Sequence, residues 1–92
     1  MAIKLLLPPN SAVVGELNDT LEPGYLCTDL LSVEVPSGVV VDVSWYPEFD
    51  PAGEYFVSVF HRTPEDMLFR QSTKSLSEVV KLVQDYAWMH GR

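Results

Sequence analysis

The clearest pattern along the chain lies in residues 75–91. Apolar side chains recur there every three or four positions, which places them in one stripe along a helix. Ser75 is followed three residues later by Glu78, the pattern of a capping box, and Gly91 suits the left-handed turn that ends many helices. The pattern therefore predicts a helix from Leu76 to His90. Its apolar stripe consists of Leu76, Val79, Val80, Val83, Tyr86 and Ala87.

Three runs rich in β-branched and aromatic residues precede this helix, at residues 39–46, 54–62 and 67–73. The segments between them hold Pro together with Asp or Gly, which favours tight turns. A further run, residues 30–35, ends at Pro36-Ser37-Gly38 and is expected to form a fourth strand. The order of these runs predicts an antiparallel meander.

The first 29 residues carry a weaker pattern. Residues 3–7 fit a short edge strand, and residues 12–17 fit either a helical turn or a strand. We therefore expect a single domain over residues 1–92. Its parts are an N-terminal segment of undetermined structure (1–29), an antiparallel sheet (30–73) and a helix (75–90). The predicted fold class is α+β: an antiparallel three- to four-stranded meander with one C-terminal helix packed on one face.

Pairing residues 39–46 with residues 54–62 across the loop PEFDPAG places apolar side chains on one face of the sheet. The predicted pairs are Trp45 with Tyr55, Val43 with Val57, and Val41 with Val59. This face is the natural position for the helix. The expected core is Val41, Val43, Trp45, Val57, Val79, Val80, Val83 and Tyr86.

The opposite face of the predicted sheet mixes polar and aromatic residues. Met67 and Phe69 join it in one register of residues 67–73, and a slip of one residue sends them to the helix side. Two interpretations stay open, because either the apolar N-terminal segment folds over this face or the face is a surface for a second copy or a partner. The residues placed on it are Asp42, Ser44, Tyr46, Phe56, Ser58, Phe60 and Arg62.

The charge of the chain narrows the classes of partner. Thirteen acidic residues against six basic ones give a net charge of −7, and residues 1–61 hold a single base, Lys4. Nucleic acid binding depends on Lys and Arg that neutralise phosphates, so we expect no direct binding of DNA or RNA. The acid excess serves solubility, or it steers a basic partner protein toward the chain.

Cysteine content and the N-terminal sequence bear on localisation. Cys27 is the only cysteine, so no intrachain disulfide can form, and the first apolar run is short and is followed by Pro8-Pro9. No stretch approaches the length of a membrane span. These features predict a cytoplasmic protein that binds no membrane.

Three carboxylates, those of Glu48, Asp50 and Glu54, crowd the loop between two predicted strands. A solvated hairpin tip, a partner-contacting loop and a metal site are all compatible with this spacing, but the loop lacks the calcium-binding pattern. His61 is expected to end a strand, and His90 lies in the last helical turn. The chain contains no nucleophile or phosphate-binding motif. We therefore expect no enzyme activity, no metal and no cofactor.

The segments WYPEFDPAGEYFVSVF and STKSLSEVVKLVQDYA together resemble the HicB-like antitoxin fold, a reduced ribonuclease-H-like sheet plus helix. The resemblance covers residues 39–90, and the segment HRTPEDM departs from the family's usual bend. It implies a binding module that blocks a small toxic ribonuclease. The matching positions are Asp50, Gly53, Tyr55 and Val57 in the hairpin, and Ser75, Leu76, Glu78 and Val79 at the helix start.

Our functional hypothesis is a non-catalytic protein-binding module, and one concrete form of it is an antitoxin- or inhibitor-like protein that binds a basic partner. The acidic tip would steer this partner, and aromatic side chains would anchor it. An alternative is a structural homodimer or small homo-oligomer that uses the aromatic face and the helix edge at Trp88 and Met89. A third is a small ligand-binding protein. The expected partner-binding residues are Glu48, Asp50, Glu54, Tyr46, Phe56 and Phe60.

Overall fold

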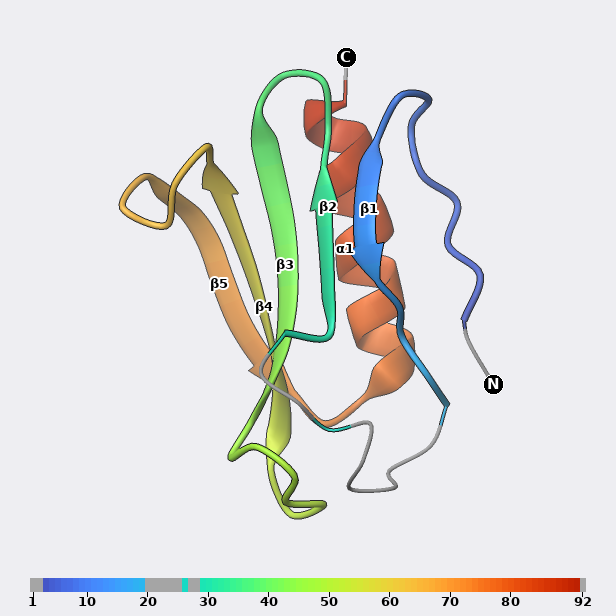
Figure 1. The fold of residues 1–92 in the computed structure, drawn as a ribbon, viewed down its shortest axis with the longest axis vertical. Coiled ribbons are helices and arrows are strands. Elements are labelled where there is room, and N and C mark those ends of the chain that lie inside the picture. The colour runs from blue at the N-terminus through green and yellow to red at the C-terminus, as the bar shows by residue number, and fades with distance from the viewer. Residues whose placement is uncertain (1–2, 20–25, 27–28, 92) are drawn as a thin grey trace.

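The computed structural model describes residues 3–19, 26 and 29–91. These residues form a five-stranded antiparallel sheet with one helix packed on one face, in the order β1-β2-β3-β4-β5 (Figure 1). The α+β meander is thus confirmed, with five strands instead of three or four. The elements are β1 (Ala12–Gly15), β2 (Leu31–Glu34), β3 (Val39–Tyr46), β4 (Glu54–His61), β5 (Met67–Thr73) and α1 (Leu76–His90).

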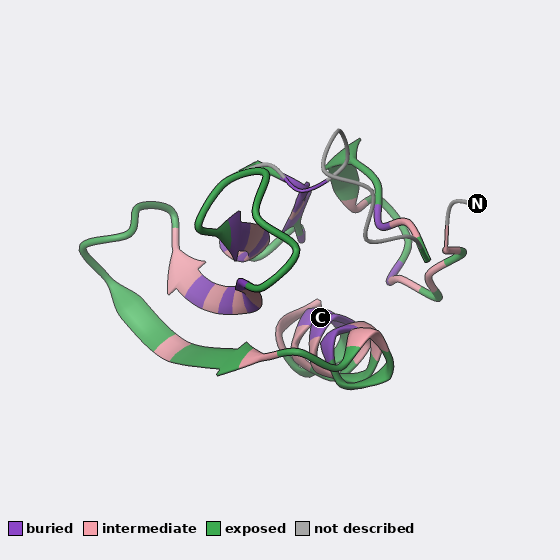
Figure 2. Ribbon diagram, turned by 90° about the horizontal axis from the view of Figure 1, so that it is seen from below, coloured by how far each residue is buried: buried purple, intermediate pink, exposed green. Residues whose placement is uncertain are grey.

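The central pair β3 and β4 follows the predicted register. Val41 lies opposite Val59, and Trp45 lies opposite Tyr55, with their rings edge to face at 4.7 Å between centroids. Buried and half-buried residues alternate along most of both strands (Figure 2). The alternation arises because successive side chains of a strand point to opposite faces of the sheet. The predicted core is buried, except that Val80 and Tyr86 are only partly covered.

Helix α1 has the predicted bounds, but its two ends differ from expectation. The Ser75 hydroxyl accepts a hydrogen bond from the backbone N–H of Glu78 at 3.2 Å, whereas the Glu78 carboxylate accepts one from Gln71 instead of closing the capping box. Gly91 has φ −83°, so the left-handed turn predicted there is wrong. In the described part of the chain, no helix has the length and apolar character needed to cross a bilayer.

Close packing, and not backbone conformation, explains the glycine at position 91. A Cβ atom there would lie 2.5 Å from Cγ of Pro8 and 2.6 Å from the carbonyl oxygen of Ala87. The glycine therefore lets the N-terminal segment approach the end of α1.

The N-terminal segment runs beside β1 and along α1, not over the opposite face of the sheet (Figure 1). The backbone N–H of Leu6 donates to the side chain of Gln84, and the indole N–H of Trp88 donates to the carbonyl of Leu6. The interpretation in which this segment covers the aromatic face is therefore wrong for its described residues. Residues 12–15 form a strand, and residues 3–7 do not.

Strand β5 combines both registers that the sequence left open. An irregularity opposite Val59 and Phe60 leaves Leu68 as an extra residue in the strand. Met67 lies opposite Phe60, on the face away from the helix, whereas Phe69 lies opposite Val59 and stacks on Tyr86 of α1. The bulge thus moves one predicted residue to each face.

The Gly91→Ala substitution should destabilise the protein by about 1 to 3 kcal/mol, because the added methyl group overpacks the contact with Pro8. Chemical denaturation checks this, with Lys81→Ala, at an exposed position of α1, as the control of small effect. An unchanged free energy of unfolding would contradict the close approach.

Candidate functional site on the open sheet face

The sheet face away from α1, here called the open face, is not covered by any other described segment. Its side chains form rows across the strands, set by the registers. Except for Val14 in β1, the central row is polar, and the neighbouring rows are partly aromatic. The central row runs Val14, Ser32, Asp42, Ser58 and Arg70; its neighbours include Ser44, Phe56 and Ser72 on one side and Glu34, Val40, Phe60 and Met67 on the other.

Two shallow hollows meet on this face. The larger, of about 420 Å³, lies over β3, β4 and β5, and the smaller, of about 370 Å³, lies toward β1. Asp29 and Asp42 line both hollows, so the two carboxylates stand where the hollows join. The other lining residues of the larger hollow are Ser44, Trp45, Tyr46, Phe56 and Arg70.

Asp42 lies in the middle of β3, between Ser32 of β2 and Ser58 of β4. Burial raises the pKa of its carboxyl group above the usual value, and the negative charge of Asp29 raises it further. The ionised carboxylate is therefore less favourable in the folded chain than in water. A cation entering the hollow would offset both effects.

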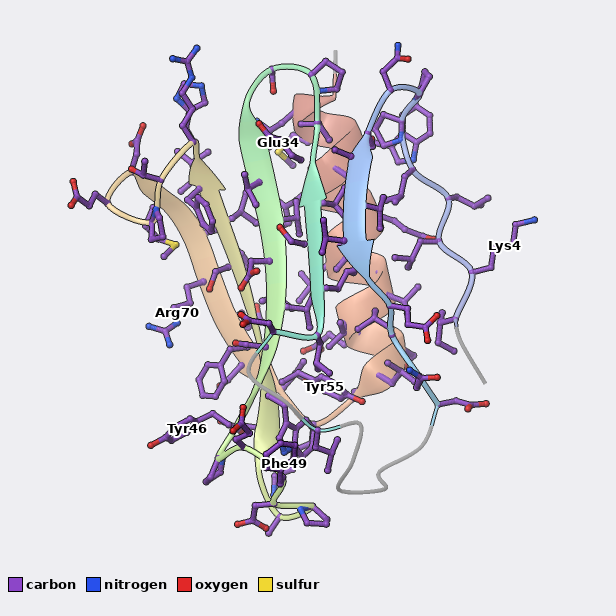
Figure 3. All side chains as sticks on the ribbon, viewed as in Figure 1. Lys4, Glu34, Tyr46, Phe49, Tyr55 and Arg70 are labelled. Carbon is purple, nitrogen blue, oxygen red and sulfur yellow. The ribbon has the colours of Figure 1, made fainter. Side chains whose placement is uncertain are left out.

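The aromatic residues Tyr46 and Phe56 also line the larger hollow. The Arg70 guanidinium lies 5.2 Å from the centroid of the Phe56 ring, which is a cation–π contact. Tyr46 is 63% exposed. Figure 3 shows Tyr46 at the hairpin end of the face and Arg70 further along it, both extending toward the β5 side of the sheet. The hollow thus combines carboxylates with ring faces, and one cation of the chain already occupies part of it.

The loop between β3 and β4 forms the tip predicted from its acidic residues. Trp45, which is buried, donates its indole N–H to the carbonyl of Asp50 at 2.7 Å. The Asp50 carboxylate accepts the backbone N–H of Ala52. At Gly53 a Cβ atom would lie 2.5 Å from the carbonyl oxygen of Tyr46, so the two sides of the tip approach too closely for a side chain. The tip is therefore held in one shape, with Glu48 exposed on it.

Phe49 is an exposed aromatic side chain in this tip that the sequence did not single out. It is 53% exposed and has φ +62°, a left-handed backbone that a bulky residue rarely adopts. Its backbone N–H donates to the carbonyl of Leu26. The fold thus holds an apolar ring in solvent in an unfavourable conformation, which is common at binding sites.

The structure brings together some of the predicted partner-binding residues and separates others. Tyr46 and Phe56 share the larger hollow, and Glu54 lies opposite Tyr46. Phe60 lies four residues beyond Phe56, about 13 Å along the strand, with Val40 and Met67 as its neighbours. It therefore belongs to the far end of the open face.

Sequence reasoning missed the role of Asp29. The backbone N–H of Leu30 donates to the carbonyl of Val43, which places Asp29 next to the end of β3. The pairing of residues 30–35 with 39–46 could not have found it, because Ser32 faces Asp42 and regular alternation would put Asp29 on the helix side with Leu31. The pairing is irregular at Leu30, whose N–H donates to Val43 although Leu31 is the residue opposite Val43, and Asp29 therefore lines the hollow on the other face.

The histidines, the cysteine and the acidic residues are further candidates for metal ligands or reactive groups. Among the residues that the structure describes, no group of three or more His, Cys, Asp or Glu is arranged to hold a metal ion. His61 ends β4, with Nδ1 3.6 Å from the Asp66 carboxylate and Nε2 3.3 Å from the Ser37 carbonyl oxygen. His90 lies in the last turn of α1. Cys27 lies outside the described residues.

Comparisons of the chain with models of protein families, with curated proteins and with solved structures found no match.

The Asp42→Asn substitution should raise the free energy of unfolding at pH 7. The folded-state pKa of Asp42 lies above its unfolded value, so its ionisation costs stability once the pH exceeds that unfolded value. The gain should shrink as the pH falls and vanish below about pH 4, where the carboxyl group is protonated in both states. Denaturation at several pH values measures this change in the free energy of unfolding, with Asp85→Asn, at an exposed position of α1, as the control. A loss of stability, or a gain independent of pH, would contradict the prediction.

Proposed function

We propose that this chain is a non-catalytic protein-binding module, and that its open face binds a basic partner. The observation that carries the proposal is Asp42, a carboxylate half-buried in the middle of an uncovered sheet face, beside a second carboxylate and in a hollow walled by aromatic rings. In the chain alone, burial and the neighbouring Asp29 both disfavour the charge of this carboxylate. A Lys or Arg side chain of a partner would favour the ionised form of Asp42 and be attracted to it.

The geometry of the hollow supports a long basic side chain as its occupant. The Phe56 ring already binds a guanidinium, that of Arg70, and Tyr46 supplies a second ring at the hairpin end. A cation over an aromatic face and beside a carboxylate, once desolvated, is a strong recognition element. Tyr46 and Phe49 are the exposed anchors next to it.

The acidic tip supports long-range attraction of the same partner. Glu48 and Asp50 are exposed there, and Glu54 begins β4 beside Tyr46. Charges at the rim of an interface increase the rate of association more than the final affinity. In this proposal the tip attracts the partner at long range, and the hollow anchors it once it is bound.

An inhibitor of a small basic protein is one concrete form of this proposal. The HicB-like resemblance over residues 39–90 implies such a role, with a toxic ribonuclease as the target. The acidic open face would then oppose a surface that itself binds RNA, because both RNA and this face are negatively charged.

The affinity for such a partner should fall about tenfold or more in Asp42→Asn and in Tyr46→Ala. The first removes the charge in the hollow, and the second removes an exposed anchor. The partner is first captured at low salt on the tagged chain and identified by mass spectrometry, and its affinity for each variant is then measured by biolayer interferometry.

Asp85→Asn is the matched control, because it removes one carboxylate from the exposed surface of α1 and should leave the affinity unchanged. The proposal fails if the captured protein is acidic, or if it binds both open-face variants as tightly as the original chain.

Replacing Glu48 and Glu54 by Gln and Asp50 by Asn, all together, should slow association with the same partner by about tenfold at low salt and leave the dissociation rate nearly unchanged. Asn at position 50 keeps an oxygen that can accept the Ala52 N–H. The difference should shrink as salt is added, since screening removes long-range attraction. Stopped-flow measurements at two salt concentrations test this. An unaltered association rate would exclude steering by the tip without affecting the role of the hollow.

A further inference from the structure

The two edges of the sheet differ in how well they are protected. At one edge, β1 has only four residues, and the N-terminal segment runs beside it, joined by a hydrogen bond from Ile3 to Leu17 (Figure 1). At the other edge, β5 has seven residues, and no described segment lies outside it. Its outer backbone groups are therefore available to pair with another strand.

Strand β5 lacks most of the devices that protect edge strands. From Phe69 to Thr73 it contains no proline and no lysine, and its one bulge, at Leu68, lies near its start. Its one charged residue, Arg70, places its guanidinium over the Phe56 ring. The strand is also held in place, because Phe69 stacks on Tyr86 and Gln71 donates to Glu78. The edge is thus regular and rigid.

We propose that β5 pairs with β5 of a second copy of this chain, in antiparallel fashion about a two-fold axis, to form a continuous ten-stranded sheet. In such a pair, the residue that lies on the axis is opposite its own copy, and its position fixes the partner of every other residue. Directly opposed residues in a continuous sheet must share a face, so the axis passes through a residue and not between two residues.

The charges and the bulge of the strand favour one centre among residues 69–72. An axis at Arg70 would oppose the two Arg70 side chains, and an axis at Ser72 would oppose Arg70 and Lys74. Like charges directly opposite each other destabilise a strand pair. An axis at Phe69 would pair Arg70 with the bulged residue Leu68.

An axis at Gln71 avoids each of these conflicts. It pairs Arg70 with the partner's Ser72 on the open face, and Phe69 with the partner's Thr73 on the helix face. The strand is therefore complementary to itself. Net charge also favours this edge, because β5 carries a single positive charge in a chain of net charge −7, so two copies meet here with less repulsion than elsewhere.

Two substitutions of the exposed residue Ser72 test the pairing, because they should act in opposite directions. Ser72→Glu places a carboxylate opposite Arg70 twice in each dimer and should lower the dimer dissociation constant about 3- to 30-fold. Ser72→Arg opposes like charges twice and should raise it by a similar factor. Both effects run against net charge alone, since added acid should disfavour self-association of an acidic chain.

Sedimentation equilibrium of the full chain from about 10 µM to about 2 mM measures these constants. Ala52→Glu and Ala52→Arg make the same charge changes at the exposed hairpin tip and should shift the constant only in the direction of net charge. Thermal melts show whether each variant is folded. Amide hydrogen exchange of residues 69–73 should be slower at high protein concentration than at low concentration.

A chain that stays monomeric over this range overturns the proposal and leaves the edge to a strand of another protein. The proposal is also overturned if Ser72→Glu weakens the dimer and Ser72→Arg strengthens it, as net charge alone predicts. It is likewise overturned if amide exchange slows at the hairpin tip and not in β5. A failure of this kind leaves the open face and its basic partner untouched, because the two tests use different residues and readouts.

Discussion

The pairing of β3 with β4 is the interaction on which the rest of the structure depends. These two eight-residue strands align Val41, Val43 and Trp45 with Val59, Val57 and Tyr55 on one face. That face is buried, and α1 packs on it. A shift of one residue would exchange the two faces, so the hydrophobic contacts specify the register. The same register puts Asp42 in the middle of the other face and carries Tyr46 and Glu54 to the tip.

One helix can bury only one face of a sheet, and this constraint gives the open face its character. Most uncovered sheet faces are simply polar, but here a half-buried carboxylate and several rings occupy it. Trp45 links the core to the tip, because its ring is buried and its indole N–H donates to the carbonyl of Asp50. The stability of the core thus also determines the shape of the acidic tip.

Much of this architecture follows from sequence patterns that are local in the chain. The alternation in 39–46 and 54–62 and the stripe in 76–90 predict strands, register and helix, because each element buries one continuous set of apolar side chains. The parts that were missed depend on contacts between distant residues. Gly91 is explained by Pro8, and the bulge at Leu68 by the need for Phe69 to reach Tyr86. No pattern within either segment contains that information.

The candidate site was predictable to a similar extent. Tyr46, Phe56 and the acidic tip lie on the strands and turn that the pattern predicts, whereas Asp29 reaches the hollow only because the pairing of β2 with β3 becomes irregular at Leu30. Its neighbour in the hollow, Arg70, is also the residue that sets the register of the proposed β5 pair. If a basic side chain displaces the Arg70 guanidinium from Phe56, the charge facing the partner's Ser72 moves as well. Binding in the hollow and pairing at the edge would then be thermodynamically linked, each changing the other by the same free energy.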